Sequence, residues 1–236
     1  MTHAVTAADV ALMRTGRWFS QLAPDVAQAL LDIAVVTHLG AGGRVFSRGD
    51  PQDGLYVVLG GALCIGGVSA QGREALVALV EAPHWIGEVS LLDDGVRTQD
   101  VWAETDARLA RVPLAPLLRL LDRRPAIWRD IGRLAMHKLR VALDLLEAAA
   151  LDQPRQRLAR RLLALADGHG QLRDGRRARV RISQERLATL VSASRQTVNE
   201  LLGEFEREGL VRRLRGAIEL VDLERLAALH ASSAAG

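Results

Sequence analysis

Short apolar runs alternate with turn-forming residues between Leu39 and Val112. Runs such as Leu55–Leu59 and Ala75–Val80 are as long as ordinary strands, and turn formers such as Gly49-Asp50-Pro51 separate them. Apolar segments of this length, closely bounded by turn formers, are typical of antiparallel β structure. The pattern predicts a small antiparallel barrel or sandwich in this part of the chain.

The pattern becomes helical across residues 115–150, where Gly132 is the only glycine. Apolar residues recur there at helical spacing, at Ile127, Ile131, Leu134, Val141 and Leu145. Such a stripe indicates an amphipathic helix. We expect it to begin after Pro125 and to run to Ala150.

A second apolar stripe lies beside the first one on this helix. It comprises Ala135, Leu139, Ala142, Leu146 and Ala149. A helix that is apolar over more than one face is either buried within its own domain or shared between that domain and a symmetry-related partner. We favour dimerisation, because two narrow stripes with small residues suit close approach of two helices.

The C-terminal part of the chain again mixes helix and strand. A helix is expected from Arg155 to Ala166, and the alternating stretch Arg179–Ile182 predicts a short strand. Both follow Asp152-Gln153-Pro154, so we place a domain boundary near residue 151.

Two short helices with good caps follow this strand. Ser183 is a favourable N-cap for a helix over Gln184–Val191, and Ser194 caps a second helix that ends before Gly209. Two helices joined by a tight turn indicate a helix-turn-helix, whose second helix enters the major groove of DNA.

The second helix carries polar side chains of the types that read base edges. Its outward N-terminal face contains Arg195, Gln196, Thr197, Asn199 and Glu200. The stretch from Leu210 to Val221 then reads as a hairpin wing, with Arg212, Arg213 and Arg215 near the phosphates. The alternative is a solvated polar face on a small helical domain, but the caps, turn, wing and charge together favour DNA binding.

Composition agrees with a folded protein. Hydrophobic residues make up 49% and charged residues 25% of the 236 residues, which argues against disorder and allows one or two domains. No uncharged window is long enough for a membrane span and no secretory signal is evident, so we expect a cytoplasmic location. The single cysteine, Cys64, can form neither an internal disulfide nor, alone, a metal or iron–sulfur site.

The net charge of +3 conceals an asymmetry. Residues 1–150 carry 15 basic and 17 acidic side chains, whereas residues 151–236 carry 16 and 11, a local net charge of +5. Lys138 is the only lysine, so almost all cations are arginine. Arginine suits phosphate and guanine contacts, although a GC-rich genome explains the bias more simply.

A candidate anion site lies in the segment His84–Leu92 and the Arg97-Thr98 pair that follows it. Gly87 permits close backbone approach, and a helical turn beginning there would direct amide N–H groups at an anion. Arg97 could add paired hydrogen bonds, and Glu88 could accept from a sugar hydroxyl. The alternative is a surface ion pair between Glu88 and Arg97.

Several of these motifs together resemble the Crp/Fnr family of transcription regulators. The cyclic-nucleotide-binding roll of that family is similar to Gly49-Asp50-Pro51, Asp53–Val58, Gly61, Ile86-Gly87-Glu88 and Arg97-Thr98, and its recognition helix is similar to Ser194–Val198. The resemblance implies an α+β fold in three parts. These are an antiparallel, jelly-roll-like β-roll that senses an effector (1–115), a long dimerisation helix (116–150) and a winged helix-turn-helix (151–236).

By this resemblance Gly87 and Arg97 hold the cyclic phosphate of cAMP or cGMP, and Glu88 binds the ribose 2′-hydroxyl. Thr98 contacts the phosphate or the base, and Val89 completes the expected ligand-binding set. Two positions depart from the family pattern. Gln99-Asp100 stands where small or hydroxyl residues are usual, and Ala142-Leu143 replaces a hydroxyl pair that recognises adenine in a family member.

We therefore expect a homodimeric regulator that binds a palindromic operator in double-stranded DNA, responds to a small effector and contacts RNA polymerase. The expected DNA-binding residues are Ser183, Ser194, Arg195, Gln196, Thr197, Asn199, Glu200, Arg212 and Arg213. No catalytic or metal-binding residue is expected.

Three alternatives remain open. The effector site could be vestigial, which would make the regulator ligand-independent. It could instead take another metabolite, or haem bound by His38, His84 or His137. An enzyme, such as a nucleotide hydrolase using Glu88 and Asp100, is the third alternative.

Overall fold

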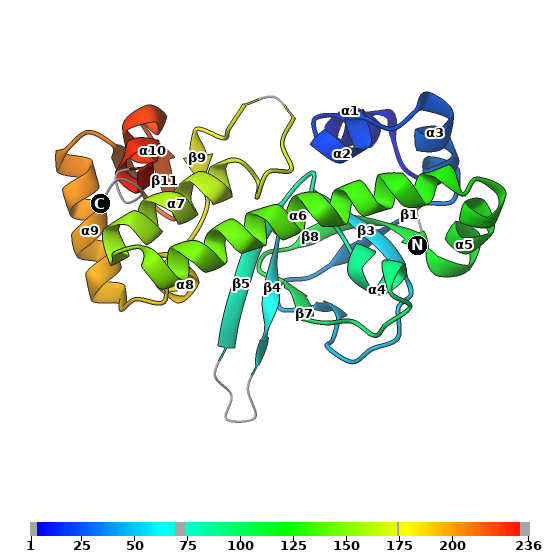
Figure 1. The fold of residues 1–236 in the computed structure, drawn as a ribbon, viewed down its shortest axis with the longest axis horizontal. Coiled ribbons are helices and arrows are strands. Elements are labelled where there is room, and N and C mark those ends of the chain that lie inside the picture. The colour runs from blue at the N-terminus through cyan, green and yellow to red at the C-terminus, as the bar shows by residue number, and fades with distance from the viewer. Residues whose placement is uncertain (1–3, 69–73, 174, 232–236) are drawn as a thin grey trace. The chain divides into compact units, whose positions relative to one another are not determined.

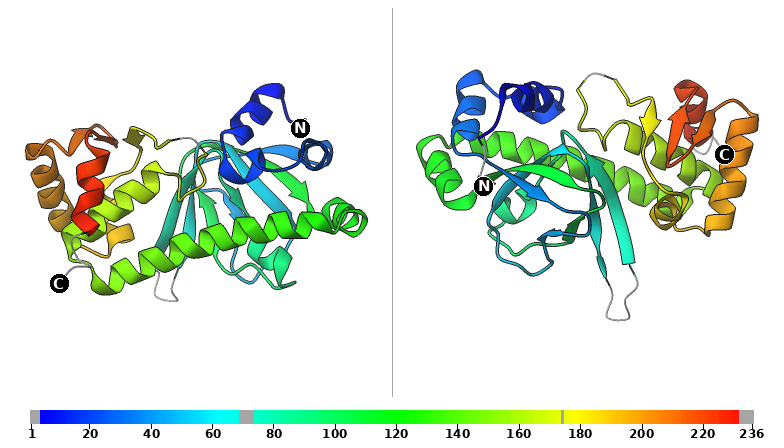
Figure 2. Two further views of the ribbon diagram at one scale, coloured as in Figure 1. Left: turned by 45° about the horizontal axis from the view of Figure 1, so that its top comes forward. Right: turned by 180° about the vertical axis from the view of Figure 1, so that it is seen from behind.

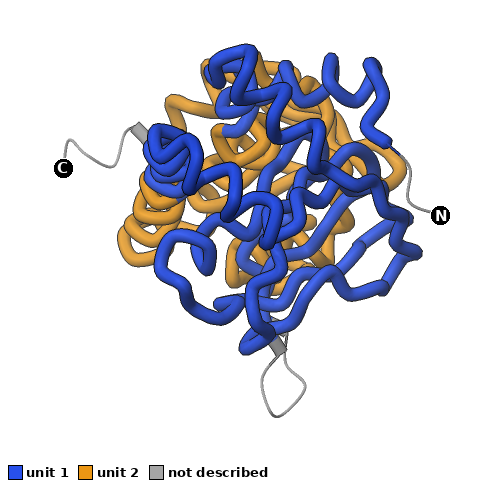
Figure 3. The backbone as a smooth tube through the Cα atoms, turned by 90° about the vertical axis from the view of Figure 1, so that its right-hand side faces the viewer, with its two compact units in different colours: residues 1–138, 171–174 blue, residues 139–170, 175–236 orange. Residues whose placement is uncertain are grey.

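A computed structural model describes residues 4–68, 74–173 and 175–231 of the chain. The chain forms two compact units (Figure 3): residues 1–138 with 171–174 form unit 1, and residues 139–170 with 175–236 form unit 2. The division between the units falls inside the long helix, after Lys138. The three-part division at residues 115 and 150 remains a prediction.

Unit 1 contains two four-stranded antiparallel sheets, which confirms the predicted β-roll (Figure 1). The first sheet has the order β1 (Val35–Leu39), β8 (Ala107–Pro113), β3 (Gly54–Gly60), β6 (Trp85–Ile86). The second has the order β2 (Arg44–Phe46), β7 (Asp100–Ala103), β4 (Ala62–Val68), β5 (Glu74–Glu81).

Strand β3 contains the run Leu55–Leu59, in which every residue is apolar and no polar residue alternates with the apolar ones. Tyr56 and Val58 pack in a cluster with residues of the second sheet, such as Leu63 and Val101. Leu55 and Val57 point the other way, into a cluster with helices. Because successive side chains of a strand lie on opposite faces, a strand covered on both faces must be apolar at every position.

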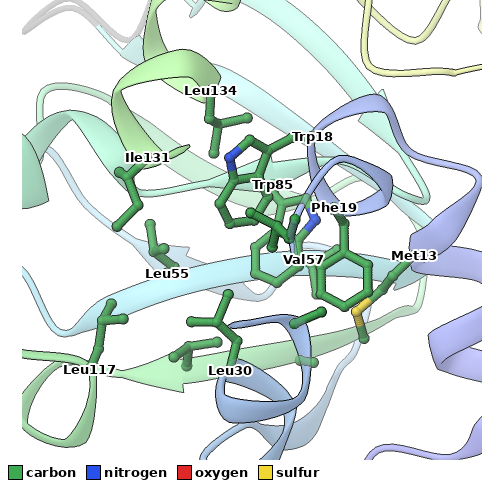
Figure 4. Close-up of a cluster of buried hydrophobic side chains, with 14 of the residues drawn as sticks. Met13, Trp18, Phe19, Leu30, Leu55, Val57, Trp85, Leu117, Ile131 and Leu134 are labelled. Carbon is green, nitrogen blue, oxygen red and sulfur yellow. The ribbon is translucent and has the colours of Figure 1, made fainter. Parts of the chain in front are cut away.

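The helices that cover the outer face of the first sheet come from both ends of unit 1 (Figure 4). They are α1 (Ala7–Arg14), α2 (Arg17–Ser20), α3 (Pro24–Asp32), α5 (Leu114–Arg123) and the first half of α6 (Ala126–Leu151). In their core the Phe19 ring stacks on Trp85, with ring centroids 5.7 Å apart. Helices α1, α2 and α3 were not predicted from the sequence, because helices this short carry little periodicity.

Helix α6 confirms the predicted long helix almost residue for residue. Ile127, Ile131 and Leu134 of its first stripe are buried in the cluster of unit 1, whereas Val141 and Leu145 of the same stripe are only partly buried. The predicted second stripe contains exposed leucines, among them Leu139 and Leu146. A helix with one buried apolar face and another exposed one has surface left for a further partner.

Helix α1 is anchored to the roll by a buried carboxylate. Asp9 forms a capping box with Thr6 and an ion pair with Arg108 of β8. The hydrogen bonds from Arg108, followed by those from Thr6, overcome the effect of burial and lower the pKa of Asp9 to about 2. This ion pair ties the N-terminal helix to the sheet.

Replacing Asp9 by asparagine is expected to lower the free energy of unfolding of unit 1 by about 2 kcal/mol at neutral pH. The carboxylate stabilises the fold above its unfolded pKa of 3.8, and this contribution is lost as the pH falls towards the folded value of about 2. Urea unfolding should show the difference, followed by the fluorescence of the four tryptophans, which all lie in unit 1.

A matched control is Asp25→Asn, which removes an exposed ion pair with Arg124. Exposed pairs contribute less than about 1 kcal/mol, so this variant should unfold almost like the wild type. Equal unfolding midpoints for the wild type and Asp9→Asn at neutral pH would contradict the anchoring role of Asp9.

Unit 2 has the predicted winged helix-turn-helix (Figure 2). Its elements are α7 (Pro154–Ala166), β9 (Arg179–Val180), α8 (Gln184–Val191), α9 (Arg195–Arg207), β10 (Val211–Leu214), β11 (Ala217–Leu220) and α10 (Leu223–Ala231). The strands form one antiparallel sheet in the order β10-β11-β9. The strand predicted to reach Ile182 ends at Val180, because only Arg179 and Val180 pair with β11.

The predicted caps of the two central helices are confirmed. The Ser183 hydroxyl accepts from the Arg186 amide, and the Ser194 hydroxyl accepts from the Thr197 amide. Gly209 follows α9 with a φ of +74°, a left-handed conformation that glycine adopts without strain. These local signals therefore position the helix-turn-helix as the sequence predicted.

Candidate functional site

The loop after β6 begins with a glycine that cannot be replaced without disturbing its neighbours. Gly87 has a φ of +100° and precedes the short helix α4 (Glu88–Leu92), the helical turn that the sequence predicted. A Cβ atom at Gly87 would lie 2.8 Å from both the Gly54 carbonyl oxygen and Arg97 Nη1. The glycine thus allows α4 to begin directly against the Arg97 guanidinium.

Arg97 is inside the protein and not on its surface. Its side chain is only 1% exposed. Nη1 donates to the Gly87 carbonyl at 3.1 Å and to the Ser90 hydroxyl at 3.0 Å, and Nη2 donates to the Gly54 carbonyl at 2.8 Å. The guanidinium also lies 4.3 Å from the centre of the Phe46 ring. Segments far apart in sequence are therefore joined around one buried cation.

Asp53 neutralises this cation. Its carboxylate lies 2.6 Å from Arg97 Nη2 and 3.2 Å from Arg111 Nη1, and it accepts a hydrogen bond from the Tyr56 hydroxyl. Burial alone raises the pKa of Asp53, but the hydrogen bonds from Tyr56 and Arg97 outweigh it and leave that pKa below its usual value. Burial and the bond to Asp53 raise the pKa of Tyr56 to about 12. The carboxylate therefore stays charged and the hydroxyl stays protonated at neutral pH.

One donor of Arg97 is not used within the described part of the protein. The Nε atom is buried and has no hydrogen-bond partner among the residues that the structure describes. A guanidinium carries donors only, and it binds phosphate or carboxylate oxygens through parallel N–H groups. The first turn of α4 adds backbone N–H groups that lack helical acceptors. Together these groups can hold an anionic oxygen.

Glu88 is buried as well, at 3% exposed, and its partner comes from the long helix. Lys138 Nζ lies 2.8 Å from Glu88 Oε2 and also donates to the Trp85 carbonyl. The alternative of a surface ion pair between Glu88 and Arg97 is wrong, because both side chains are buried and bonded elsewhere. Sequence reasoning missed Lys138 in this role, although its being the sole lysine was a signal.

The remaining predicted ligand-site residues lie at the surface. Val89 and Thr98 are exposed. Asp100, the departure from the family pattern, pairs with Arg44 at 3.0 Å and accepts from the Arg48 amide at 3.0 Å. Its charge is therefore compensated by the β2 region and does not remain unpaired.

The recognition helix α9 presents its predicted polar residues to solvent. Arg195, Gln196, Asn199 and Glu200 are exposed, while Thr197 is half-buried. The opposite face, which includes Val198, Leu202 and Phe205, is buried. Gln196 Nε2 donates to Glu200 Oε1 at 2.9 Å, so these two side chains form one hydrogen-bonded pair on the helix surface.

The two wing arginines predicted to contact DNA have different partners. Arg212 pairs with Glu219 of the hairpin at 3.0 Å. Arg213 pairs with Glu206 of α9 at 2.8 Å and also donates to Asn199 at 3.1 Å. The hydrogen bonds from the Arg213 backbone and side chain lower the pKa of Glu206. Arg213 therefore connects the wing to the recognition helix.

The described residues bear on other ligand classes as well. Within residues 4–68, 74–173 and 175–231, no group of three or more His, Cys, Asp or Glu side chains could hold a metal ion. The candidate haem ligands His38, His84 and His137 lie on β1, before β6 and on α6. In the same part of the chain, no helix combines the length and apolarity needed to cross a membrane.

Two family models match the chain, one on each side of the long helix. The cyclic nucleotide-binding domain model matches residues 36–124, and the Crp-like helix-turn-helix domain model matches residues 156–229. The first range contains the Gly87 and Arg97 site, and the second contains α8, α9 and the wing.

Relatives resemble nearly the whole chain. A CRP-like cAMP-activated global transcriptional regulator from Mycobacterium tuberculosis is 32% identical over 93% of this chain and 98% of its own. A cyclic AMP receptor protein from Thermus thermophilus is 30% identical over 88% and 94% of the two chains. The solved structure of a CRP/FNR-family transcriptional regulator from Thermus thermophilus aligns with a TM-score of 0.64 at 27% identity, covering 84% and 99%.

Proposed function

Because the chain belongs to the Crp/Fnr family of transcription regulators, we propose that it binds a palindromic operator as a homodimer and that a cyclic nucleotide controls this binding. The observation that carries the effector proposal is the buried Arg97, whose Nη1 donates to the Gly87 carbonyl and whose Nε has no hydrogen-bond partner among the described residues. A buried cation with an unused donor suits a small anion.

The cyclic phosphate binds Arg97 and the first turn of α4, which Gly87 allows to begin directly against the guanidinium. Glu88 accepts from the ribose 2′-hydroxyl, and Val89 and Thr98 border the site from the surface. The names of the mycobacterial and Thermus relatives favour cAMP. Adenine recognition must differ from the hydroxyl-based kind, because Ala142 and Leu143 offer no side-chain hydrogen bond.

Ligand binding is coupled to the long helix through Glu88. The carboxylate that would bind the ribose already accepts from Lys138 of α6. A ribose hydroxyl at Glu88 competes with or rearranges this contact, and so favours one position of α6 over another. A ligand shifts a conformational equilibrium by its difference in affinity for the two states.

Calorimetry with cAMP and cGMP tests the effector, and a DNA titration with and without each nucleotide tests the control. We expect one nucleotide to bind and to raise operator affinity. If neither nucleotide gives a heat of binding and the protein still binds DNA, the result would favour a ligand-independent regulator, in which Asp53 remains paired with Arg97. As parts of the same proposal, the protein acts in the cytoplasm, contacts RNA polymerase and catalyses no reaction.

At the recognition helix, Arg195 is the best candidate for a bidentate guanine contact. Replacing it by alanine is expected to cost about 1–3 kcal/mol of operator affinity and to relax the preference at one base pair in each half-site. Selection from random duplexes measures this effect. A palindrome whose preferences are unchanged in Arg195→Ala would assign Arg195 to the phosphates.

A further inference from the structure

A hydrogen-bonded cluster joins the wing to the recognition helix. The Glu206 carboxylate of α9 accepts from the Arg213 backbone N–H and from Arg213 Nε, each at 2.8 Å. The carboxylate thereby fixes both the strand and the side chain of Arg213. In this position, Arg213 Nη1 lies 3.1 Å from Asn199 Oδ1.

The chemistry of arginine decides how Asn199 is oriented. A guanidinium has donors only, so the oxygen of the Asn199 amide, and not its nitrogen, must face Arg213. Gln184 Nε2 of α8 approaches the same oxygen at 3.4 Å, a longer and weaker contact. With its oxygen engaged by these donors, Asn199 offers DNA only the N–H groups of Nδ2.

This orientation changes what Asn199 can read. Asparagine ordinarily recognises adenine with both ends of its amide, accepting from N6 and donating to N7. We propose that Arg213 is a positioning residue that makes Asn199 a donor-only reader, which selects guanine over adenine at the base it contacts. Guanine offers a donor-only amide two adjacent acceptors, O6 and N7, whereas adenine offers only N7 and places its N6 amino group, a donor, where guanine has O6. The inference rests on the proposed DNA-binding function.

Arg212 provides a matched control on the same strand. It carries the same charge, is exposed and pairs with Glu219 inside the hairpin. Loss of either arginine removes one cation from the wing and should reduce the salt dependence of DNA binding similarly. Only the loss of Arg213 should free the Asn199 oxygen and alter base preference.

The test is selection from random duplexes with the full-length wild type, Asn199→Ala, Arg213→Ala and Arg212→Ala, each with cAMP or cGMP present. Asn199→Ala identifies the base pair that Asn199 reads, because preference there disappears. At this base pair we expect guanine for the wild type, and adenine or no preference for Arg213→Ala. Arg212→Ala should keep the wild-type preference and lose affinity for all sequences alike.

Titrations of the selected operator and of its adenine-substituted form give the magnitude. The wild type should prefer the selected operator by roughly tenfold, the size of one base contact. The ratio should fall to near one or below in Arg213→Ala. In the Asn199→Ala background, Arg213→Ala should change the ratio no further. Glu206→Ala, which releases Arg213 without removing it, should weaken the same preference.

The outcomes separate this inference from the function on which it rests. A palindrome with unchanged preferences in Arg213→Ala, or a wild-type preference for adenine at the Asn199 position, would overturn the inference and leave the DNA-binding function intact. No enriched palindrome for any of the proteins would overturn the proposed function and the inference with it. Circular dichroism and melting curves check that the exposed substitutions leave the fold unchanged.

Discussion

Replacing Arg97 by glutamine is expected to weaken the binding of cAMP or cGMP by about 2–5 kcal/mol, the cost of leaving a desolvated charge without its partner. By the proposed function, the phosphate gains a charge-assisted hydrogen bond from Arg97 inside the protein, where water competes little. Glutamine keeps a donor but loses the charge. Calorimetric titration of both proteins measures the difference.

The control for Arg97→Gln is Arg111→Gln, because Arg111 is the other cation on Asp53 but is partly exposed. We expect Arg111→Gln to bind the nucleotide nearly as the wild type does. Arg97 also pairs with Asp53, so its replacement affects the stability of unit 1 as well. Tryptophan fluorescence during urea unfolding distinguishes a loss of nucleotide binding from unfolding of unit 1. Equal titration curves for the wild type and a folded Arg97→Gln protein would show that Arg97 does not bind the phosphate.

The second large effect concerns assembly. Met136, Leu139, Leu143 and Leu146 are 53%, 47%, 55% and 67% exposed on α6. Their spacing of three and four residues is that of the a and d positions of a coiled coil. Burying each leucine against a partner contributes about 1.5–3 kcal/mol, so the stripe favours a symmetric dimer.

Leu139→Glu should therefore dissociate the dimer, because it places a carboxylate from each copy into an apolar seam. Leu139→Met keeps the volume and apolar character, and should remain dimeric. Sedimentation gives the masses. A monomer mass for the wild type, or an unchanged dimer for Leu139→Glu, would contradict the proposed interface.

The candidate effector site could be predicted only in part. Gly87, Glu88 and Arg97 lie within one short stretch of the chain, so their association followed from local spacing. The partners of these side chains could not be predicted from local spacing, because Asp53 is 44 residues from Arg97 and Lys138 is 50 residues from Glu88. A buried guanidinium can be satisfied by many acceptors, and the fold decides which of them is near.

The DNA-binding unit shows the same division on a smaller scale. The serine caps and the apolar face of α9 depend on residues within one or two turns, and the sequence predicted both. The wing arginines, however, were predicted as equivalent phosphate contacts. Packing of the hairpin against α9 brings Arg213, and not Arg212, to Glu206.

The sequence by itself thus determined the order of the β-roll, the long helix and the helix-turn-helix and the ends of the central helices, because periodicity, caps and turns are set by neighbours along the chain. Its motifs also indicated the class of regulator by their resemblance to a known family. Only the tertiary structure decided that Arg97 and Glu88 are buried and which side chains they and Arg213 bind. The physical reason is that a charged side chain takes whichever acceptors or donors the packed strands and helices place within hydrogen-bond distance, and that placement depends on contacts between distant segments.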